Sequence, residues 1–172
     1  MSESQTDPAL IDLYAHIGSI ASTWASLENA VDVTIWRIAG LDHHDGACIT
    51  VQINSLQYRL LALFALLDRR IPEADVIKKL HKFIQDSAKL ARCRNRAVHD
   101  PVFVTGGGKI EVLSIGTNRK LEYQFAEKTA DYREINLEIA KFLERYLALE
   151  QEIDAALQAR RQEIRALTEK AT

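Results

Sequence analysis

Apolar residues recur every three or four positions over most of this chain, and this spacing constrains the fold more than any other feature. It matches one face of an α-helix. Four stretches carry it: Pro8 to Ala39, Cys48 to Arg70, Glu73 to Val98 and Asp131 to Ala166. Each has a single apolar stripe, which is typical of helices that pack in a bundle. We therefore expect a mainly α protein, a four- to five-helix up-and-down bundle.

Residues with known preferences for helix ends mark the limits of these stretches. Pro8 suits a first helical turn, Gly40 suits a C-terminal stop, and Ser55 is a candidate N-cap. Pro101 disfavours the α conformation one residue earlier, so the third helix must end near Asp100. The sequence LDHHDG after Gly40 is expected to be a loop.

The spacing changes between the third and fourth predicted helices. Val102 to Val104 and Lys109 to Ile115 are strand-like runs parted by Gly106 to Gly108, and Gly116 to Asn118 marks a turn before Leu121 to Phe125. We expect a small β-hairpin or meander at about 102–125. The three glycines are interpreted as a turn, because no helix and no Lys-Ser or Lys-Thr pair follows them as in a phosphate-binding loop.

Length and composition fit one globular domain over 1–172. The chain has 172 residues, 47% hydrophobic and 27% charged, with a formal net charge of -2, so binding nucleic acid by bulk positive charge is excluded. Cys48 and Cys93 are too few for a disulfide framework, and neither a secretion signal nor a membrane span is expected. These features predict a cytoplasmic protein. The charged helix end at about 158–172 is expected to project or to pair with a partner chain.

Basic side chains follow one face of the third predicted helix, at alternating steps of four and three residues. The row consists of Lys78, Lys82, Gln85, Lys89, Arg92, Arg96 and His99. A solvated surface is the usual interpretation of such a row.

Arg94 departs from this pattern, because it falls on the opposite, apolar face of the same helix. A guanidinium in that place needs an anion or a wet cleft. Within the chain the best partner is Glu28, which falls on the apolar line of the first helix. A structural pair of Arg94 with Glu28 is one interpretation, and a binding cleft is the other.

His99 ends the same helix, where the macrodipole favours a positive charge. An imidazole there can hold or yield a proton near neutral pH, or it can simply cap the helix. Asn95 lies four residues earlier and nearly in line with His99, whereas Arg94 lies about 140° around the helix. A cleft shared by two chains would bring Arg94 and His99 together more easily than one chain does.

The run Arg94-Asn95-Arg96-Ala97-Val98-His99 resembles the motif of HEPN domains: an Arg, usually a polar residue, and a His after four to six intervening positions. The stretch Trp24 to Glu28 is also similar to the first helix of that family. The resemblance covers most of the chain in architecture and implies a four- or five-helix bundle.

The resemblance implies metal-independent RNA cleavage by a homodimer, as in a toxin or defence nuclease. Arg94, His99 and Asn95 would be catalytic, and Arg92, Arg96 and Lys89 would contact flanking phosphates. In one toxin branch of this family, a Tyr two positions after the His is modified by a partner nucleotidyltransferase. This chain has Pro101 at that position, so the resemblance does not support a nucleotidyltransferase antitoxin as partner. The alternative is a non-catalytic dimeric module that binds RNA, a nucleotide or a protein partner.

No metal or cofactor is expected. His43, His44 and Asp45, with Cys48 nearby, have donor atoms that metals bind. No second cluster with tetrahedral spacing completes a site.

Overall fold

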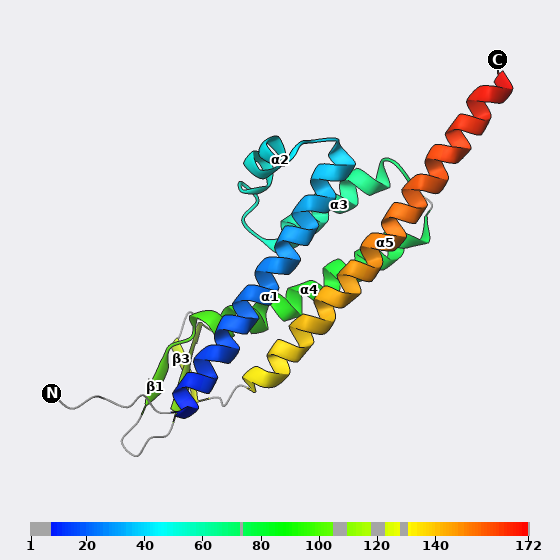
Figure 1. The fold of residues 1–172 in the computed structure, drawn as a ribbon. Helices are drawn as coiled ribbons and strands as arrows, with labels where there is room; N and C mark the ends of the chain where they lie inside the picture. The colour runs from blue at the N-terminus through cyan, green and yellow to red at the C-terminus, as the bar shows by residue number, and fades with distance from the viewer. Residues whose placement is uncertain (1–7, 73, 105–109, 118–122, 128–130, 172) are drawn as a thin grey trace. The chain divides into compact units, whose positions relative to one another are not determined.

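The structure is a computed structural model that describes residues 8–72, 74–104, 110–117, 123–127 and 131–171. It is mainly helical, as the apolar spacing predicts, and Figure 1 shows its elements. The helices are α1 (Pro8–Ala39), α2 (His43–Thr50), α3 (Leu56–Asp68), α4 (Asp75–His99) and α5 (Tyr132–Ala171).

The first helix, α1, has the predicted limits. It begins at Pro8 and ends before Gly40, which takes a φ of 73°. There the Gly40 N–H donates to the Arg37 carbonyl and the Leu41 N–H to the Trp36 carbonyl, which is the Schellman pattern. A left-handed residue is required at this position, and glycine adopts that conformation at no steric cost.

The prediction of a loop at LDHHDG is wrong, because His43–Thr50 forms the short helix α2. The Asp42 side chain caps it by accepting hydrogen bonds from the backbone N–H groups of His44 and Asp45. Gly46 is buried against Trp36: a Cβ on Gly46 would lie 2.4 Å from Trp36 Cγ. The helix therefore depends on a local cap and on tertiary packing, neither of which produces an apolar stripe.

A single helix over Cys48 to Arg70 is also wrong, since the chain leaves helical structure between α2 and α3. The predicted cap at Ser55 is confirmed, because its hydroxyl accepts from the Tyr58 N–H and α3 begins at the next residue. An N-cap of this kind fixes the start of a helix.

Three strands lie between α4 and α5 in the chain: β1 (Val102–Val104), β2 (Ile110–Thr117) and β3 (Tyr123–Glu127). They form an antiparallel sheet in the order β1-β2-β3, with Val102 opposite Val112 and Ile115 opposite Phe125. The expected turn at Gly116 to Asn118 begins too early, because β2 continues through Thr117. The predicted turn at Gly106 to Gly108 lies outside the described residues.

The chain divides into two compact units, Met1–Trp24 with Leu90–Ala140 and Ala25–Lys89 with Lys141–Thr172. In the first unit, Ser19 of α1 donates a hydrogen bond of 3.1 Å to Asn136 of α5. Its buried residues include Ile20, Trp24, Leu90, Ala97, Tyr132 and Ile139.

Among the residues whose burial the structure describes, most of the buried apolar side chains belong to the second unit. Phe83 of α4 stacks on Phe142 of α5, with ring centroids 4.0 Å apart. Thr34 of α1 donates to Glu150 of α5 over 3.0 Å. Burial raises the pKa of Tyr146, which lies fully inside this unit.

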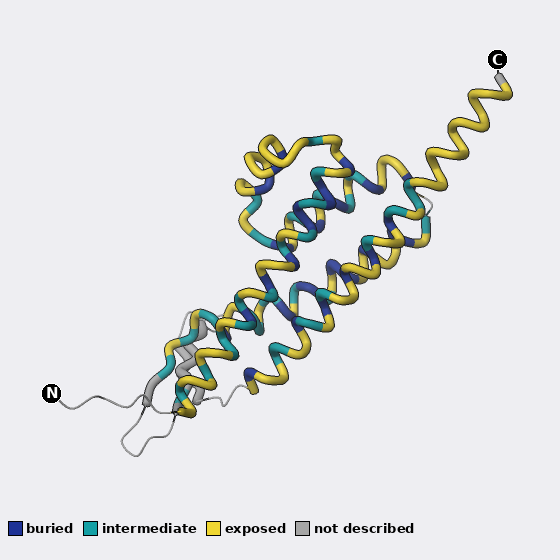
Figure 2. Tube along the Cα trace, viewed as in Figure 1, coloured by how far each residue is buried: buried dark blue, intermediate teal, exposed yellow. Residues whose placement is uncertain are grey.

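The C-terminal part of α5 differs from the rest of the unit, because every residue from 158 to 170 is exposed, as Figure 2 shows.

Candidate functional site

The candidate residues occupy the last turns of α4, in the first unit. The helix ends where the sequence predicts, at His99, two residues before Pro101. The Asp100 N–H still donates to the Arg96 carbonyl over 2.9 Å and closes the final turn. Helical geometry therefore sets the positions of Arg94, Asn95 and His99 on this segment.

Arg94 and Asn95 are in contact. The Arg94 Nη1 donates a hydrogen bond of 3.0 Å to Asn95 Oδ1. Arg94 is half-buried, and its Nε is buried without a hydrogen-bond partner among the described residues. A guanidinium stays charged at every physiological pH and favours an anionic partner for its remaining donors.

His99 lies in a different environment from Arg94. It is exposed, and so is Asn95, which precedes it by one helical turn on the same face. Arg94 is half-buried on another face of α4. The structure thus links Arg94 to Asn95 by a hydrogen bond and Asn95 to His99 by helical spacing, and within one chain Arg94 and His99 have different surroundings.

The basic face predicted for α4 is solvent-exposed at every position. Lys89, Arg92 and Arg96, the candidates for phosphate contact, are all exposed and share the face of His99. Arg92 and Arg96 belong to the first unit, and Lys89 is the last residue of a segment of the second. Lys78, near the start of the helix, is already paired with Asp75 over 3.1 Å.

Glu28 is half-buried on α1, as its place on the apolar line predicts. It belongs to the second unit, whereas Arg94 belongs to the first. The pairing of Arg94 with Glu28 stays a prediction.

The second unit contains polar groups that sequence analysis did not single out. Arg59 of α3 contacts Asp32 of α1 through an Nη1 to Oδ2 hydrogen bond of 2.9 Å. Burial raises the pKa of Asp32, and the nearby Arg59 charge opposes this rise. Asp32 lies one position from the buried Val31, so a carboxylate beside an apolar stripe was the available signal.

The second unit also contains two Arg-Arg pairs that the sequence analysis did not identify as a candidate site, Arg69-Arg70 and Arg160-Arg161. The signal was a doubled basic residue at the end of one predicted helix and in the charged part of another. Neither pair carries a spacing motif.

The described part of the chain contains neither a metal-ligand cluster nor a helix that could span a membrane. No three His, Cys, Asp or Glu residues there come together as a metal site would require. None of the described helices combines the length and apolar content needed to cross a bilayer.

Comparisons of this chain with protein-family models, with curated proteins and with solved structures found no match.

Proposed function

We propose that this protein is a HEPN-like, metal-independent endoribonuclease, acting as a homodimer in the manner of a toxin or defence nuclease. The proposal rests on one observation: a half-buried Arg94, held by Asn95 and with a buried unpaired Nε among the described residues, stands within five residues of an exposed His99. An anchored cation and an accessible proton carrier at one helix end suit chemistry at a phosphodiester once a second copy of the chain brings them together.

The proposed reaction needs one base, one acid and one cation. A base removes the ribose 2′-OH proton, and the 2′ oxygen attacks the neighbouring phosphorus. The bond from phosphorus to the 5′ oxygen then breaks, and an acid protonates that oxygen, which leaves a 2′,3′-cyclic phosphate and a 5′-OH. His99 moves protons, Arg94 stabilises the charge on the phosphate, and Asn95 orients the guanidinium.

Two copies of the site explain why the protein would be a dimer. Arg94 and His99 occupy different faces of α4, and a single imidazole cannot be base and acid at the same moment. A twofold axis beside the end of α4 would place the Arg94 of one copy near the His99 of the other. The two histidines would then share the two proton transfers.

The exposed Lys89, Arg92 and Arg96 would hold the phosphates that flank the cut. Such contacts are independent of sequence and weaken with salt. They agree with a protein whose net charge of -2 gives no general attraction to RNA.

Incubation of the purified protein with total RNA in EDTA tests the proposal. Wild-type protein should cut RNA, and His99→Ala and Arg94→Ala should each lower the rate at least about 100-fold, the usual range for a positioned acid or base. His44→Ala and Arg165→Ala are matched controls, because both residues are exposed on other helices, and they should cut like wild type. Undiminished cleavage by His99→Ala contradicts the proposal.

A non-catalytic RNA-binding module is the second candidate, favoured by the different environments of Arg94 and His99 within one chain. It predicts that Arg94→Ala weakens RNA binding several-fold while no protein variant, wild type included, produces cleaved RNA. The same incubation, followed by a filter-binding assay, separates the two functions.

A further inference from the structure

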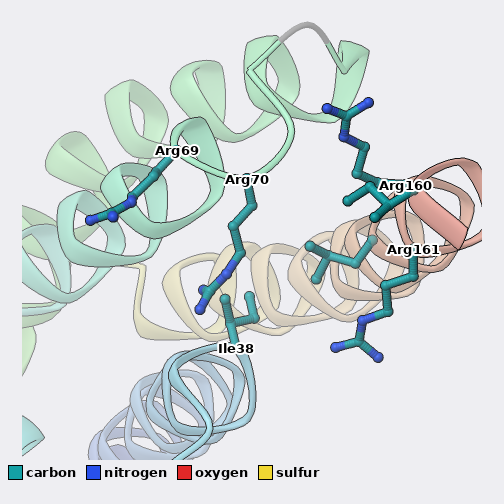
Figure 3. A pocket seen from close by; sticks show the side chains of 7 residues that line it. Ile38, Arg69, Arg70, Arg160 and Arg161 are labelled. Atoms are coloured by element: carbon teal, nitrogen blue, oxygen red, sulfur yellow. The ribbon is translucent and has the colours of Figure 1, made fainter. Parts of the chain in front are cut away.

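A second basic site lies in the second unit, around a cavity of about 420 Å³. Four arginines border it, two from the end of α3 and two from α5, and Figure 3 shows them. They are Arg69, Arg70, Arg160 and Arg161. None of them belongs to the candidate site at the end of α4.

The first pair is fixed by the way α3 ends. Arg69 is the C-cap, and the Arg70 and Ile71 N–H groups both donate to the Leu67 carbonyl over 2.8 Å. Ile71 is buried and anchors the segment. In Figure 3 the Arg70 side chain crosses from this segment toward Ile38 of α1. The backbone is therefore held where the arginine enters the cavity.

The second pair comes from the part of α5 where all residues are exposed. Arg160 pairs with Glu163 over 2.5 Å and points to the opposite side from Arg161. Among the described residues, Arg69, Arg70 and Arg161 have no ion pair. The C-terminal dipole of α3 stabilises positive charge at Arg69 and Arg70, but it does not stabilise the charges of the pair on α5.

In Figure 3 the Arg70 and Arg161 side chains extend on the same side, whereas Arg160 extends to the opposite side and Arg69 points away from α5. The like charges of Arg70 and Arg161 repel each other, and a bound anion removes that cost. Neither Arg70 nor Arg161 has an ion pair among the described residues, so this side of the cavity carries uncompensated positive charge in a protein whose net charge is -2. Guanidinium groups match phosphate oxygens through paired N–H donors.

The remaining wall of the cavity is aliphatic. It is formed by Ile38, Leu157 and Ile164, and Ile164 is 50% exposed. An apolar surface beside several cations suits a ligand with a charged end and an apolar or planar body. Guanidinium planes also stack on aromatic rings.

We propose that this cavity binds an organic triphosphate, with the phosphate chain on Arg70 and Arg161 and the planar body of a nucleoside against the aliphatic wall. The volume lies within the range of about 300–1,000 Å³ typical of small-molecule sites. The site is separate from the proposed ribonuclease centre and does not depend on it.

Calorimetric titration of the full chain with ATP, without divalent cations, tests this assignment. Arg70→Gln combined with Arg161→Gln should raise the Kd for ATP at least tenfold. The matched control combines Arg165→Gln with Lys170→Gln, which removes the same charge from exposed positions outside the cavity lining. It should change the Kd less than twofold, and circular dichroism should show both variants folded.

Inorganic triphosphate is the second probe, because it has the charge without the planar body. ATP should bind more tightly than inorganic triphosphate. Ile164→Ser should weaken the binding of ATP and leave the binding of inorganic triphosphate unchanged. Absence of ATP binding to wild type, or an equal loss in the cavity variant and its control, overturns the site. Equal affinity for the two probes overturns the role given to the aliphatic wall.

Discussion

Arg59 and Asp32 join α3 to α1 through an ion pair of 2.9 Å in which both side chains are largely buried, at 16% and 12% exposure. The two residues are 27 positions apart in the chain. Removing one member of such a pair leaves a buried charge without compensation, which costs more than the pair itself contributes.

Arg59→Met should therefore lower the free energy of unfolding at pH 7 by about 3 kcal/mol, the lower end for a broken buried pair. Lys79→Met is the control: Lys79 is paired with Glu152 over 2.6 Å, but both side chains are about half exposed. It should cost less than about 1 kcal/mol. Urea denaturation measures the free energy of unfolding of both variants. Equal losses would show that burial does not make the Arg59–Asp32 pair more important for stability than an exposed pair.

The pH dependence of the Arg59→Met variant follows from the pKa of Asp32. Burial holds this pKa above the usual value of 3.8, and Arg59 opposes the rise, so loss of Arg59 raises the pKa further. A raised carboxyl pKa means that stability falls as the pH rises through the folded-state value. The stability gap between variant and wild type should consequently narrow as the pH is lowered from neutral toward the usual carboxyl pKa of 3.8. Thermal melts across that range measure it, and a constant gap contradicts the prediction.

Gly46 and Gly18 should respond in opposite ways to substitution by alanine. A Cβ at Gly46 would meet the Trp36 ring at 2.4 Å, whereas nothing lies within 4 Å of one at Gly18. Gly46→Ala should destabilise the protein by about 1–3 kcal/mol through overpacking. Gly18→Ala, inside α1, should stabilise it by about 0.5–1 kcal/mol. Melting temperatures of the two variants check both signs.

Phe142 should be one of the most sensitive core positions, because it stacks on Phe83 and the Arg145 guanidinium lies 5.3 Å from its ring centroid. Phe142→Ala should cost about 3–5 kcal/mol. Leu147 on the same helix is 42% exposed, so Leu147→Ala should cost much less. Denaturant titration measures the free energy of unfolding of both variants. Comparable losses in Phe142→Ala and Leu147→Ala would contradict the prediction and show that the aromatic stack contributes little.

The basic face of α4 should control the salt dependence of RNA binding. Each phosphate contact to a single strand contributes about -0.7 to the slope of log K against log salt. Arg92→Gln and Arg96→Gln should each make the slope shallower by about that amount, while Lys141→Gln on α5 should leave the slope unchanged. Binding measured between 50 and 200 mM salt, as is usual for this effect, checks the prediction. An unaltered slope in both arginine variants removes these residues from the RNA contact.

Local signals in the sequence predicted most of the helical framework. Pro8, Gly40, Ser55 and Pro101 act within a few residues through fixed dihedral angles or a cap, so they mark helix ends in the structure as they do in the sequence. The helix α2 was missed because its stability comes from Asp42 and from the burial of Gly46 against Trp36, and a short polar segment has no apolar period.

The candidate site was predictable only as a set of positions on one helix. Spacing places Asn95 and His99 on one face and Arg94 on another, and the exposure of these residues agrees with that placement. The hydrogen bond from Arg94 to Asn95 joins adjacent residues, so helix geometry alone does not require it.

The helical class, most helix ends and the exposed basic face of α4 are predictable from local sequence patterns, because each depends on neighbours within a few residues. The contact of Arg59 with Asp32 and the cavity bordered by two distant Arg-Arg pairs arise from the packing of separate helices. Such encounters depend on how apolar stripes from separate helices pack together, and no local pattern encodes which side chains that packing brings face to face.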